Sequence, residues 1–225
     1  MSEVTAGIII FPDLTQLDAT GPWEVFASTP GMRVLTIAKT REPIKAKGGL
    51  LLLADATLAD CPPLDIVCVP GGPGANVAME DEEILGFLRA RAPGLRYLTS
   101  VCTGALVLGA AGLLRGRRAT THWSAHDLLA GLGAIPTAGR VVRDGNVFTG
   151  GGVTAGIDFA LTLVAEIFGS EAAQMVQLGL EYAPEPPFAA GTPATAPANV
   201  LAAALTRGVA MRARREELVA RSKIF

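Results

Sequence analysis

Short apolar runs rich in β-branched residues recur along this chain, and each is followed by a turn or by a helical pattern. The runs cover residues 4–11, 32–38, 65–69 and 95–101. They are apolar on both faces, which is typical of strands that helices cover on each side of a parallel sheet. The sequence therefore predicts an α/β fold with a mostly parallel sheet and helices on both faces.

Helical patterns occupy the intervals between and after these runs, with Gly or Pro near many of their ends. The predicted helices cover residues 20–28, 81–92, 103–113, 125–132, 154–168 and 170–180. An Asp-Gly pair within 140–149 predicts an antiparallel hairpin. The Pro-rich segment 183–197 cannot hold a helix, so we expect an extended excursion and then a last helix at 198–221. All of these elements are expected to form a single domain, 1–225.

The composition limits the partners that the chain can bind. A net charge of -2 gives no general attraction for nucleic acid or anionic lipid, so we expect a small-molecule substrate. The longest nearly apolar stretch, 104–114, is shorter than the ~20 residues of a membrane span. The first residues lack the basic region of a signal peptide. We therefore expect a cytoplasmic protein that binds neither nucleic acid nor membranes.

A candidate nucleophile stands where an apolar run gives way to a helix rich in small residues. Cys102 ends the fourth run, and Gly104 and Gly109 let the next helix approach the sheet closely, as in a nucleophile elbow. Helix N-terminal amides favour a thiolate, so we expect Cys102 to be reactive rather than a small core residue. Cys61 and Cys68 are expected to be unreactive, and the absence of CxxC spacing argues against disulfides and structural zinc.

A candidate acid or base lies in the loop that leaves the first run. Parallel strands end at one edge of a sheet, where catalytic groups gather, so we expect Asp18 beside Cys102. The alternative interpretation is that Asp18 is only a helix N-cap. Asp13, in a Pro-Asp turn, and Glu24, one turn further on, are weaker candidates.

Two glycine clusters flank this edge. Gly71 and Gly72 follow the third run, and Gly151 and Gly152 precede a predicted helix. Their backbone amides can form an anion hole for charge that develops on a substrate, although turn formation alone explains each glycine as well. Neither cluster has the spacing of a nucleotide-binding loop.

The two histidines, His122 and His126, are four residues apart. No third ligand is evident, so we expect a pocket-lining or structural role and no bound metal. A dyad of Cys102 with His122, as in an amidase-like hydrolase, stays open as an alternative.

The last helix carries basic residues interleaved with acids. We interpret it as a solvated face rather than a nucleic-acid contact. The arginines of this face are Arg207, Arg212, Arg214, Arg215 and Arg221.

Six motifs spread over nearly the whole chain are shared with a known family. They are Gln16-Leu-Asp-Ala-Thr-Gly-Pro, Val69-Pro-Gly-Gly, Thr99-Ser-Val-Cys-Thr-Gly, Ala119-Thr-Thr-His-Trp, Gly150-Gly-Gly-Val-Thr-Ala-Gly and Leu180-Glu-Tyr-Ala-Pro. With these motifs the chain resembles the ThiJ/PfpI superfamily of class I glutamine amidotransferase-like proteins and, within it, the isocyanide hydratases. Protease- and deglycase-like relatives usually have His after the Cys and Glu in the first loop, where this chain has Thr103 and Asp18.

The resemblance implies a flavodoxin-like three-layer sandwich, a homodimer and an enzyme without a cofactor. It implies hydration of an isocyanide to an N-formamide, in which Cys102 adds to the terminal carbon and gives a thioimidate. Asp18 would move the protons, and the Thr103 hydroxyl would orient Asp18 or the attacking water. The same motifs assign His122, Trp123 and Val153, with the four glycines of the clusters, to substrate binding or the anion hole.

A ligand sensor is the alternative from another class. Transcription regulators share the Ser-Val-Cys-Thr-Gly and Thr-Thr-His-Trp motifs, and in them a DNA-binding module follows. No helix-turn-helix pattern is evident after the Pro-rich segment, so we expect a freestanding enzyme.

Overall fold

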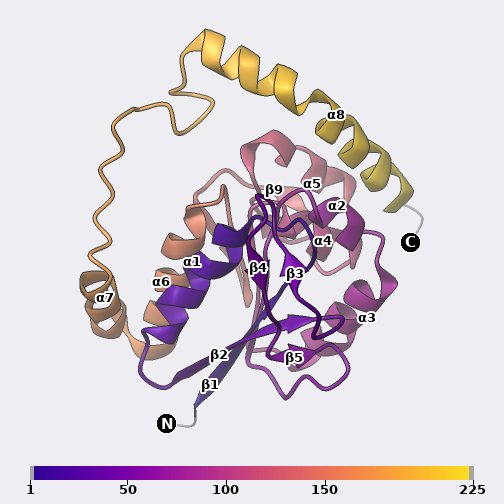
Figure 1. Cartoon of the computed structure of the whole chain (residues 1–225). Helices are drawn as coiled ribbons and strands as arrows, with labels where there is room; N and C mark the ends of the chain where they lie inside the picture. Colours follow the sequence, from indigo (N-terminus) through magenta and orange to yellow (C-terminus); the bar gives the residue numbers. More distant parts are fainter. Residues whose placement is uncertain (1–2, 223–225) are drawn as a thin grey trace.

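A seven-stranded sheet forms the centre of the computed structural model, which describes residues 3–222 (Figure 1). The strand order is β10-β11-β7-β6-β1-β2-β5, and every neighbouring pair is parallel except β10 with β11. The strands are β1 (Val4–Ile9), β2 (Met32–Ala38), β5 (Ala56–Thr57), β6 (Ile66–Val69), β7 (Tyr97–Val101), β10 (Val141–Asp144) and β11 (Val147–Gly150). The predicted parallel sheet and its antiparallel hairpin are confirmed.

Two short pairs of strands lie outside this sheet. They are the antiparallel pair β3 (Ile44–Lys45) with β4 (Leu51–Leu52), and the parallel pair β8 (Arg118–Ala119) with β9 (Ile135–Pro136). The sequence did not predict them or β5, because a strand of two residues is too short to show a period of two.

The helices cover both faces of the sheet, and most lie where they were predicted. They are α1 (Gln16–Ala27), α2 (Ala75–Ala78), α3 (Glu82–Arg91), α4 (Gly104–Ala110), α5 (Leu128–Gly131), α6 (Ala155–Phe168), α7 (Ser170–Gly179) and α8 (Ala198–Ser222). Figure 1 shows α1, α6 and α7 on one side of the sheet and α3 and α4 on the other. The short helix α2 was not predicted.

Helix α1 begins four residues earlier than the sequence indicated. Proline usually ends a helix, because it lacks an amide hydrogen and clashes with the preceding turn. Pro22 nevertheless lies inside α1, where it packs closely against Gly156 of α6. The predicted helix at 125–132 is divided into the 3-10 turn η2 (Trp123–Ala125) and α5.

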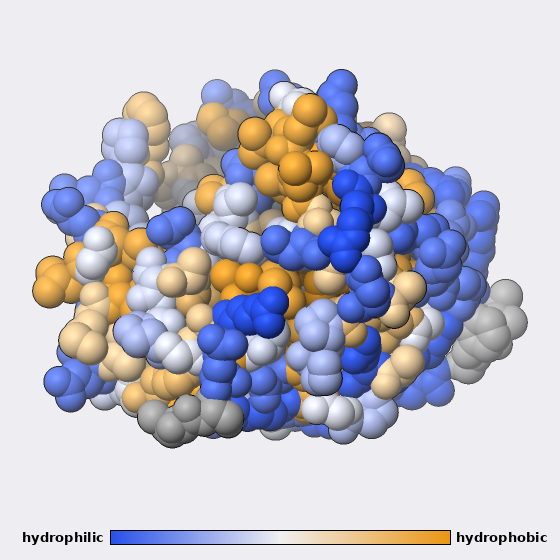
Figure 2. Space-filling view, turned by 60° about the horizontal axis from the view of Figure 1, so that its bottom comes forward, coloured by the Kyte–Doolittle hydropathy of each residue, from blue (hydrophilic) through white to orange (hydrophobic). Residues whose placement is uncertain are grey.

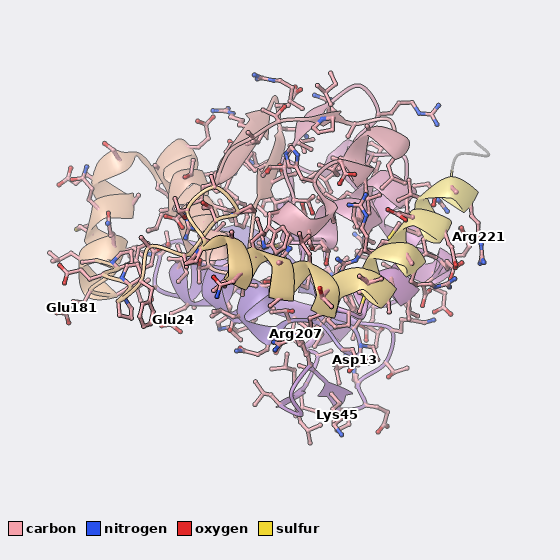
Figure 3. All side chains as sticks on the ribbon, turned by 90° about the horizontal axis from the view of Figure 1, so that it is seen from above. Asp13, Glu24, Lys45, Glu181, Arg207 and Arg221 are labelled. Atoms are coloured by element: carbon pink, nitrogen blue, oxygen red, sulfur yellow. The ribbon has the colours of Figure 1, made fainter. Side chains whose placement is uncertain are left out.

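The long helix α8 arches over the end of the sheet at which the parallel strands finish (Figure 1). Seen from above, it crosses this end, with Arg207 and Arg221 along its length (Figure 3). It packs against α2, α5 and η2. The excursion at 183–197 has no helix in its interior, as expected from its prolines.

Apolar side chains on the face drawn in Figure 2 form patches separated by hydrophilic surface. Among residues 3–222, no helix is both long and apolar enough to cross a membrane.

The loop after β6 and the start of α4 approach each other as closely as backbones can. A Cβ atom on Gly104 would overlap the carbonyl oxygen of Val69, and one on Gly71 would overlap the amide of Thr103. Glycine at these two positions therefore brings the β6 loop against the turn that carries Cys102.

We expect Gly104→Ala to lower the free energy of unfolding by about 1–3 kcal/mol, the usual cost of overpacking. Gly86→Ala is the matched control, because Gly86 lies inside α3 and a Cβ atom there would meet no other atom within 4 Å. That change should raise stability by up to about 1 kcal/mol through helix propensity. Urea unfolding measures the free energy of unfolding of both variants. An equal effect of the two substitutions would contradict the close approach of the β6 loop to α4.

Candidate active site

Cys102 lies on a strained turn between β7 and α4. Its backbone has a φ of 55°, in the left-handed region that non-glycine residues rarely adopt. The Cys102 amide donates to the carbonyl of Gly150 (3.1 Å), and the Thr121 hydroxyl donates to the carbonyl of Cys102 (2.7 Å). The residue is only 5% exposed. This geometry is that of the nucleophile elbow predicted from the sequence.

Asp18 lies in the first turn of α1 and is fully buried. The Gly71 amide donates to its Oδ2 atom (2.9 Å). Its Oδ1 atom is also buried and accepts no hydrogen bond within residues 3–222. The N-cap of α1 is Thr15, three residues earlier, so the interpretation of Asp18 as an N-cap is wrong. The carboxyl interacts with the Cys102 thiol, so the two groups are placed to exchange a proton.

The Thr103 hydroxyl holds the β6 loop and does not contact Asp18. Its oxygen accepts from the Gly72 amide (3.0 Å) and lies 3.3 Å from the Gly72 carbonyl, to which it can donate. The preceding residue of the same loop, Gly71, donates its amide hydrogen to Asp18. Two consecutive amides of one loop therefore bond to Asp18 and to Thr103. The hydrogen bonds thus connect Thr103 to Asp18 through this loop and not directly.

Three of the amides assigned to an anion hole already donate to protein acceptors. The Gly71 and Gly72 amides bind Asp18 and Thr103, and the Gly151 amide donates to the Arg140 carbonyl (2.9 Å). This corrects the expectation for those three glycines. Their amides fix the shape of the site.

Burial controls the protonation of Asp18. It raises the pKa of this carboxyl from 3.8 to about 7, because a buried charge loses its hydration. The Gly71 amide and the Cys102 thiol oppose the rise, and the positive charge of Lys47 does so more weakly.

Burial also raises the pKa of the Cys102 thiol, to about 12, and the negative charge of Asp18 contributes to the rise. The Thr103 amide and the positive charge of Arg215 lower this pKa. Burial and the charge of Asp18 thus act against the thiolate that the helix N-terminus was expected to favour. Both shifts favour the protonated forms, so we expect the pair of Asp18 and Cys102 to retain a proton near neutral pH.

A cavity of about 640 Å³ brings together the predicted pocket residues His122, Trp123, Gly151, Gly152 and Val153. Part of the Pro-rich excursion, residues 191–193, lines it as well. The Cys102 side chain is not among its lining residues. The lining residue Thr121 nevertheless contacts the Cys102 backbone, so the cavity adjoins the elbow.

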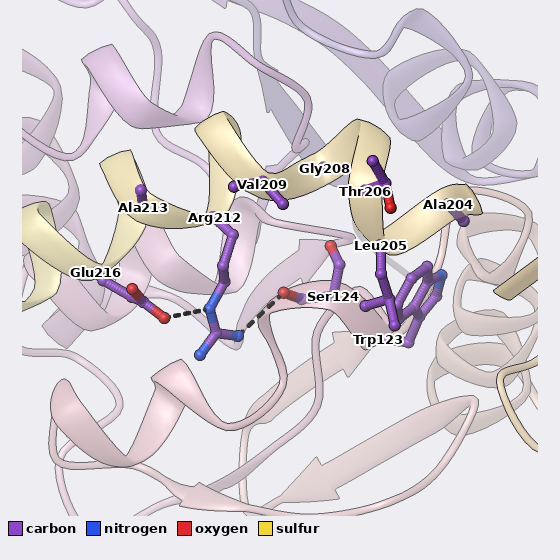
Figure 4. Close-up of a pocket in the computed structure, with 10 residues that line it drawn as sticks. All are labelled: Trp123, Ser124, Ala204, Leu205, Thr206, Gly208, Val209, Arg212, Ala213 and Glu216. Carbon is purple, nitrogen blue, oxygen red and sulfur yellow. Dashed lines mark hydrogen bonds and ion pairs between the residues drawn. The ribbon is translucent and has the colours of Figure 1, made fainter. Parts of the chain in front are cut away.

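A second cavity of about 600 Å³ lies between η2 and α8, and Trp123 lines both cavities. Figure 4 shows Trp123 facing Leu205 in this second cavity, with Arg212 joining α8 to Ser124. A helix that the sequence indicated only as a solvated face therefore lines a cavity that shares Trp123 with the cavity beside the elbow.

The imidazole of His122 is held by Ser124. The Ser124 amide donates to Nδ1 (3.3 Å), which places the ring proton of neutral His122 on Nε2. Burial lowers the pKa of His122, and so do the positive charges of Arg215 and Lys47. No hydrogen bond joins His122 to Cys102 in the described part of the chain. The structure thus gives the Cys–His dyad no support.

Of the remaining candidates, His126 lines the same cavity as His122, whereas Glu24 is not among the residues that line it. His126 contacts the carbonyl of Thr137 through Nε2 (3.0 Å). Glu24 is exposed and lies at the periphery of the molecule in Figure 3, so it is no substitute for Asp18. No group of three or more possible metal ligands occurs among residues 3–222.

Cys61 and Cys68 are buried and free. Burial raises the pKa of each thiol, that of Cys68 to about 12. Cys68 belongs to the core of β6, as the sequence indicated.

Sequence reasoning missed the cations of this site. Lys47 lies in the turn between β3 and β4, and Arg215 lies on α8 and is only 7% exposed. The placement of Arg215 on a solvated face was therefore wrong. A signal was present, because Arg215 shares a helical stripe with Leu218 and Val219, which are also buried.

Comparison with known proteins agrees with this geometry. An isonitrile hydratase of Pseudomonas putida is 56% identical over 216 residues, which are 96% of this chain and 95% of that protein. The crystal structure of a ThiJ/PfpI family protein from Pseudomonas syringae has a TM-score of 0.95 and 43% sequence identity. The match covers 97% of this chain and 91% of the P. syringae chain.

The HTH-type transcriptional regulator GbdR of Pseudomonas aeruginosa is 35% identical over 140 residues, which are 60% of this chain and 37% of the regulator. The family model described as the DJ-1/PfpI family matches residues 4–166. The resemblance inferred from the motifs is thus confirmed, and this chain belongs to the DJ-1/PfpI family.

Proposed function

We propose that this protein is an isocyanide hydratase, which converts an isocyanide R–N≡C and water into the formamide R–NH–CHO. The isonitrile hydratase of P. putida matches this chain over nearly its whole length. Isonitrile is another word for isocyanide. The observation that carries the proposal is the buried Asp18 carboxyl, which the Gly71 amide holds beside the buried Cys102 thiol, and burial raises the pKa of both groups. The terminal carbon of an isocyanide must receive both a nucleophile and a proton, and such a pair supplies both.

In the first step, the Cys102 sulfur attacks the terminal carbon and forms a C–S bond. The thiol proton passes to the same carbon through Asp18, and the C≡N bond becomes a double bond. The product is a thioimidate, R–N=CH–S–Cys102. No charge is created overall, because the proton that the pair holds ends on the carbon.

In the second step, water attacks the thioimidate carbon while the Asp18 carboxylate takes one of its protons. Asp18 passes that proton to the nitrogen, which gives R–NH–CH(OH)–S–Cys102. The C–S bond then breaks, and the hydroxyl proton returns to the sulfur as R–NH–CHO leaves. One proton of the water ends on nitrogen, and the other restores the thiol.

The cavity beside the elbow is suited to the organic group R. Trp123 and Val153 provide apolar surface, and His122 offers a neutral ring with a proton on Nε2. A neutral imidazole leaves the proton of the Asp18 and Cys102 pair undisturbed. We assign these three residues to substrate binding.

The sensor alternative has less support. This chain spans 37% of the regulator GbdR but 95% of the P. putida hydratase.

The proposal includes a cytoplasmic homodimer. Three free cysteines are typical of a reducing compartment. Large apolar side chains are exposed at Leu178 (81%), Phe188 (78%) and Val209 (63%), on α7, the excursion and α8. Burial of these side chains against a second copy would remove them from water.

The test of the function is to follow formamide formation from a simple aryl or alkyl isocyanide. Asp18→Asn should lower turnover by about 10²–10⁴-fold, the usual contribution of general acid–base catalysis. The carboxamide oxygen that this substitution introduces can still accept from the Gly71 amide, so the fold should persist and the melting temperature at pH 8 should not fall. Hydration at the wild-type rate by Asp18→Asn would contradict the assigned role.

For the oligomer, light scattering at micromolar concentration should give twice the chain mass of 23.2 kDa. Leu178→Asp should weaken the dimer, because it places a charge in the proposed interface. Val77→Asp, at another exposed apolar position (71%), is the control and should leave the dimer intact. A monomeric wild-type protein would contradict the proposal.

A further inference from the structure

Arg215 is a buried cation without a carboxylate partner in the described part of the chain. It is 7% exposed, and within residues 3–222 it takes part in no ion pair. Its neighbours on α8 differ, because Arg212 pairs with Asp127 (2.5 Å) and Arg214 pairs with Glu80 (2.8 Å). Burial of an unpaired charge is costly unless a nearby group offsets it.

Asn76 holds this guanidinium in place. Arg215 donates through Nε to Oδ1 of Asn76 (3.2 Å), and Nδ2 of Asn76 contacts the sulfur of Met211 (3.0 Å). Asn76 belongs to α2, which follows directly on the loop that binds Asp18 and Thr103. Arg215 is thus hydrogen-bonded to the helix that directly follows the active-site loop.

Arg215 is buried on the side of α8 that faces the active-site region, where its charge and that of a Cys102 thiolate can interact. It lowers the pKa of the Cys102 thiol, and the Cys102 thiolate in turn raises the pKa of Arg215. The other charges in this region are those of Asp18, Lys47 and Arg212. Asp18 disfavours the thiolate, so a cation is needed to counter it.

We infer that Arg215, positioned by Asn76, stabilises the Cys102 thiolate that forms during turnover. The sulfur carries negative charge twice in the proposed reaction, when it gives up its proton and when it leaves the tetrahedral intermediate. The inference therefore rests on the proposed function for its purpose. Arg215 is a positioning and electrostatic residue, with no assigned contact to the substrate.

The test measures the thiol itself, which separates it from any failure of the hydratase proposal. Iodoacetamide labelling of Cys102 is followed by peptide mass spectrometry as a function of pH. Below the pKa, the rate follows the thiolate fraction, and one pKa unit is a factor of ten. Arg215→Met should slow labelling at pH 8 by about threefold, the factor for half a pKa unit, and Arg215→Lys should recover most of the rate.

Arg214→Met is the matched control, because it removes the neighbouring charge from the exposed side of α8. It should label as the wild type does. Asn76→Ala should slow labelling by less than Arg215→Met, since the cation remains but is not held. In the hydration assay, Arg215→Met should lower kcat more than it changes KM.

Removal of an unpaired buried charge should leave the melting temperature of Arg215→Met unchanged or higher. If that variant does not fold, Arg215→Gln replaces it, because its amide can still bond to Asn76. Labelling of the folded charge-free variant at the wild-type rate, with an unchanged pH profile, would overturn the inference. It would then follow that Arg215 only fixes α8 to α2.

Discussion

Two consecutive residues of the β6 loop hold the acid and the nucleophile in one geometry. The amide of Gly71 binds Asp18, and that of Gly72 binds the residue after Cys102. The loop reaches both only because glycine lets it lie against the start of α4. The strained backbone of Cys102 is therefore fixed from both sides, by this loop and by β11. The proton shared by Asp18 and Cys102 depends on that arrangement.

The burial of Asp18 lowers the free energy of unfolding above neutral pH, where the carboxyl is ionised. The pKa of Asp18 is 3.8 in the unfolded chain and about 7 in the fold, so the folded protein binds the proton more tightly. That contribution is complete below about pH 4 and is lost as the pH rises through about 7. With about 1.4 kcal/mol for each pKa unit, the difference is on the order of 4 kcal/mol. The cost is offset by the large apolar core around the sheet, and it keeps a proton donor available near neutral pH.

Much of the fold and part of the candidate site could be predicted from the sequence. The features that could not be predicted depend on contacts between residues that are distant in sequence. The parallel strands, the hairpin and the elbow at Cys102 follow from periodicity and turn residues, which act locally. The protonation of Cys102 could not be predicted, because it depends on burial and on the charge of Asp18, which is distant in sequence. The role of Arg215 was hidden for a similar reason, since a helix rich in arginine gives no sign of which one turns inward. The glycine amides were assigned to an anion hole because their acceptors within the fold were unknown.

The central claim is that Asp18 and Cys102 hold one proton between them in the resting protein. An infrared titration measures this directly, because the protonated carboxyl and the S–H group absorb in separate regions. The carboxyl band should disappear as the pH rises through about 7 and should be absent in Asp18→Asn, while the S–H band of Cys102 persists well above pH 8. Loss of the S–H band near neutral pH, with Asp18 ionised throughout, would contradict the account.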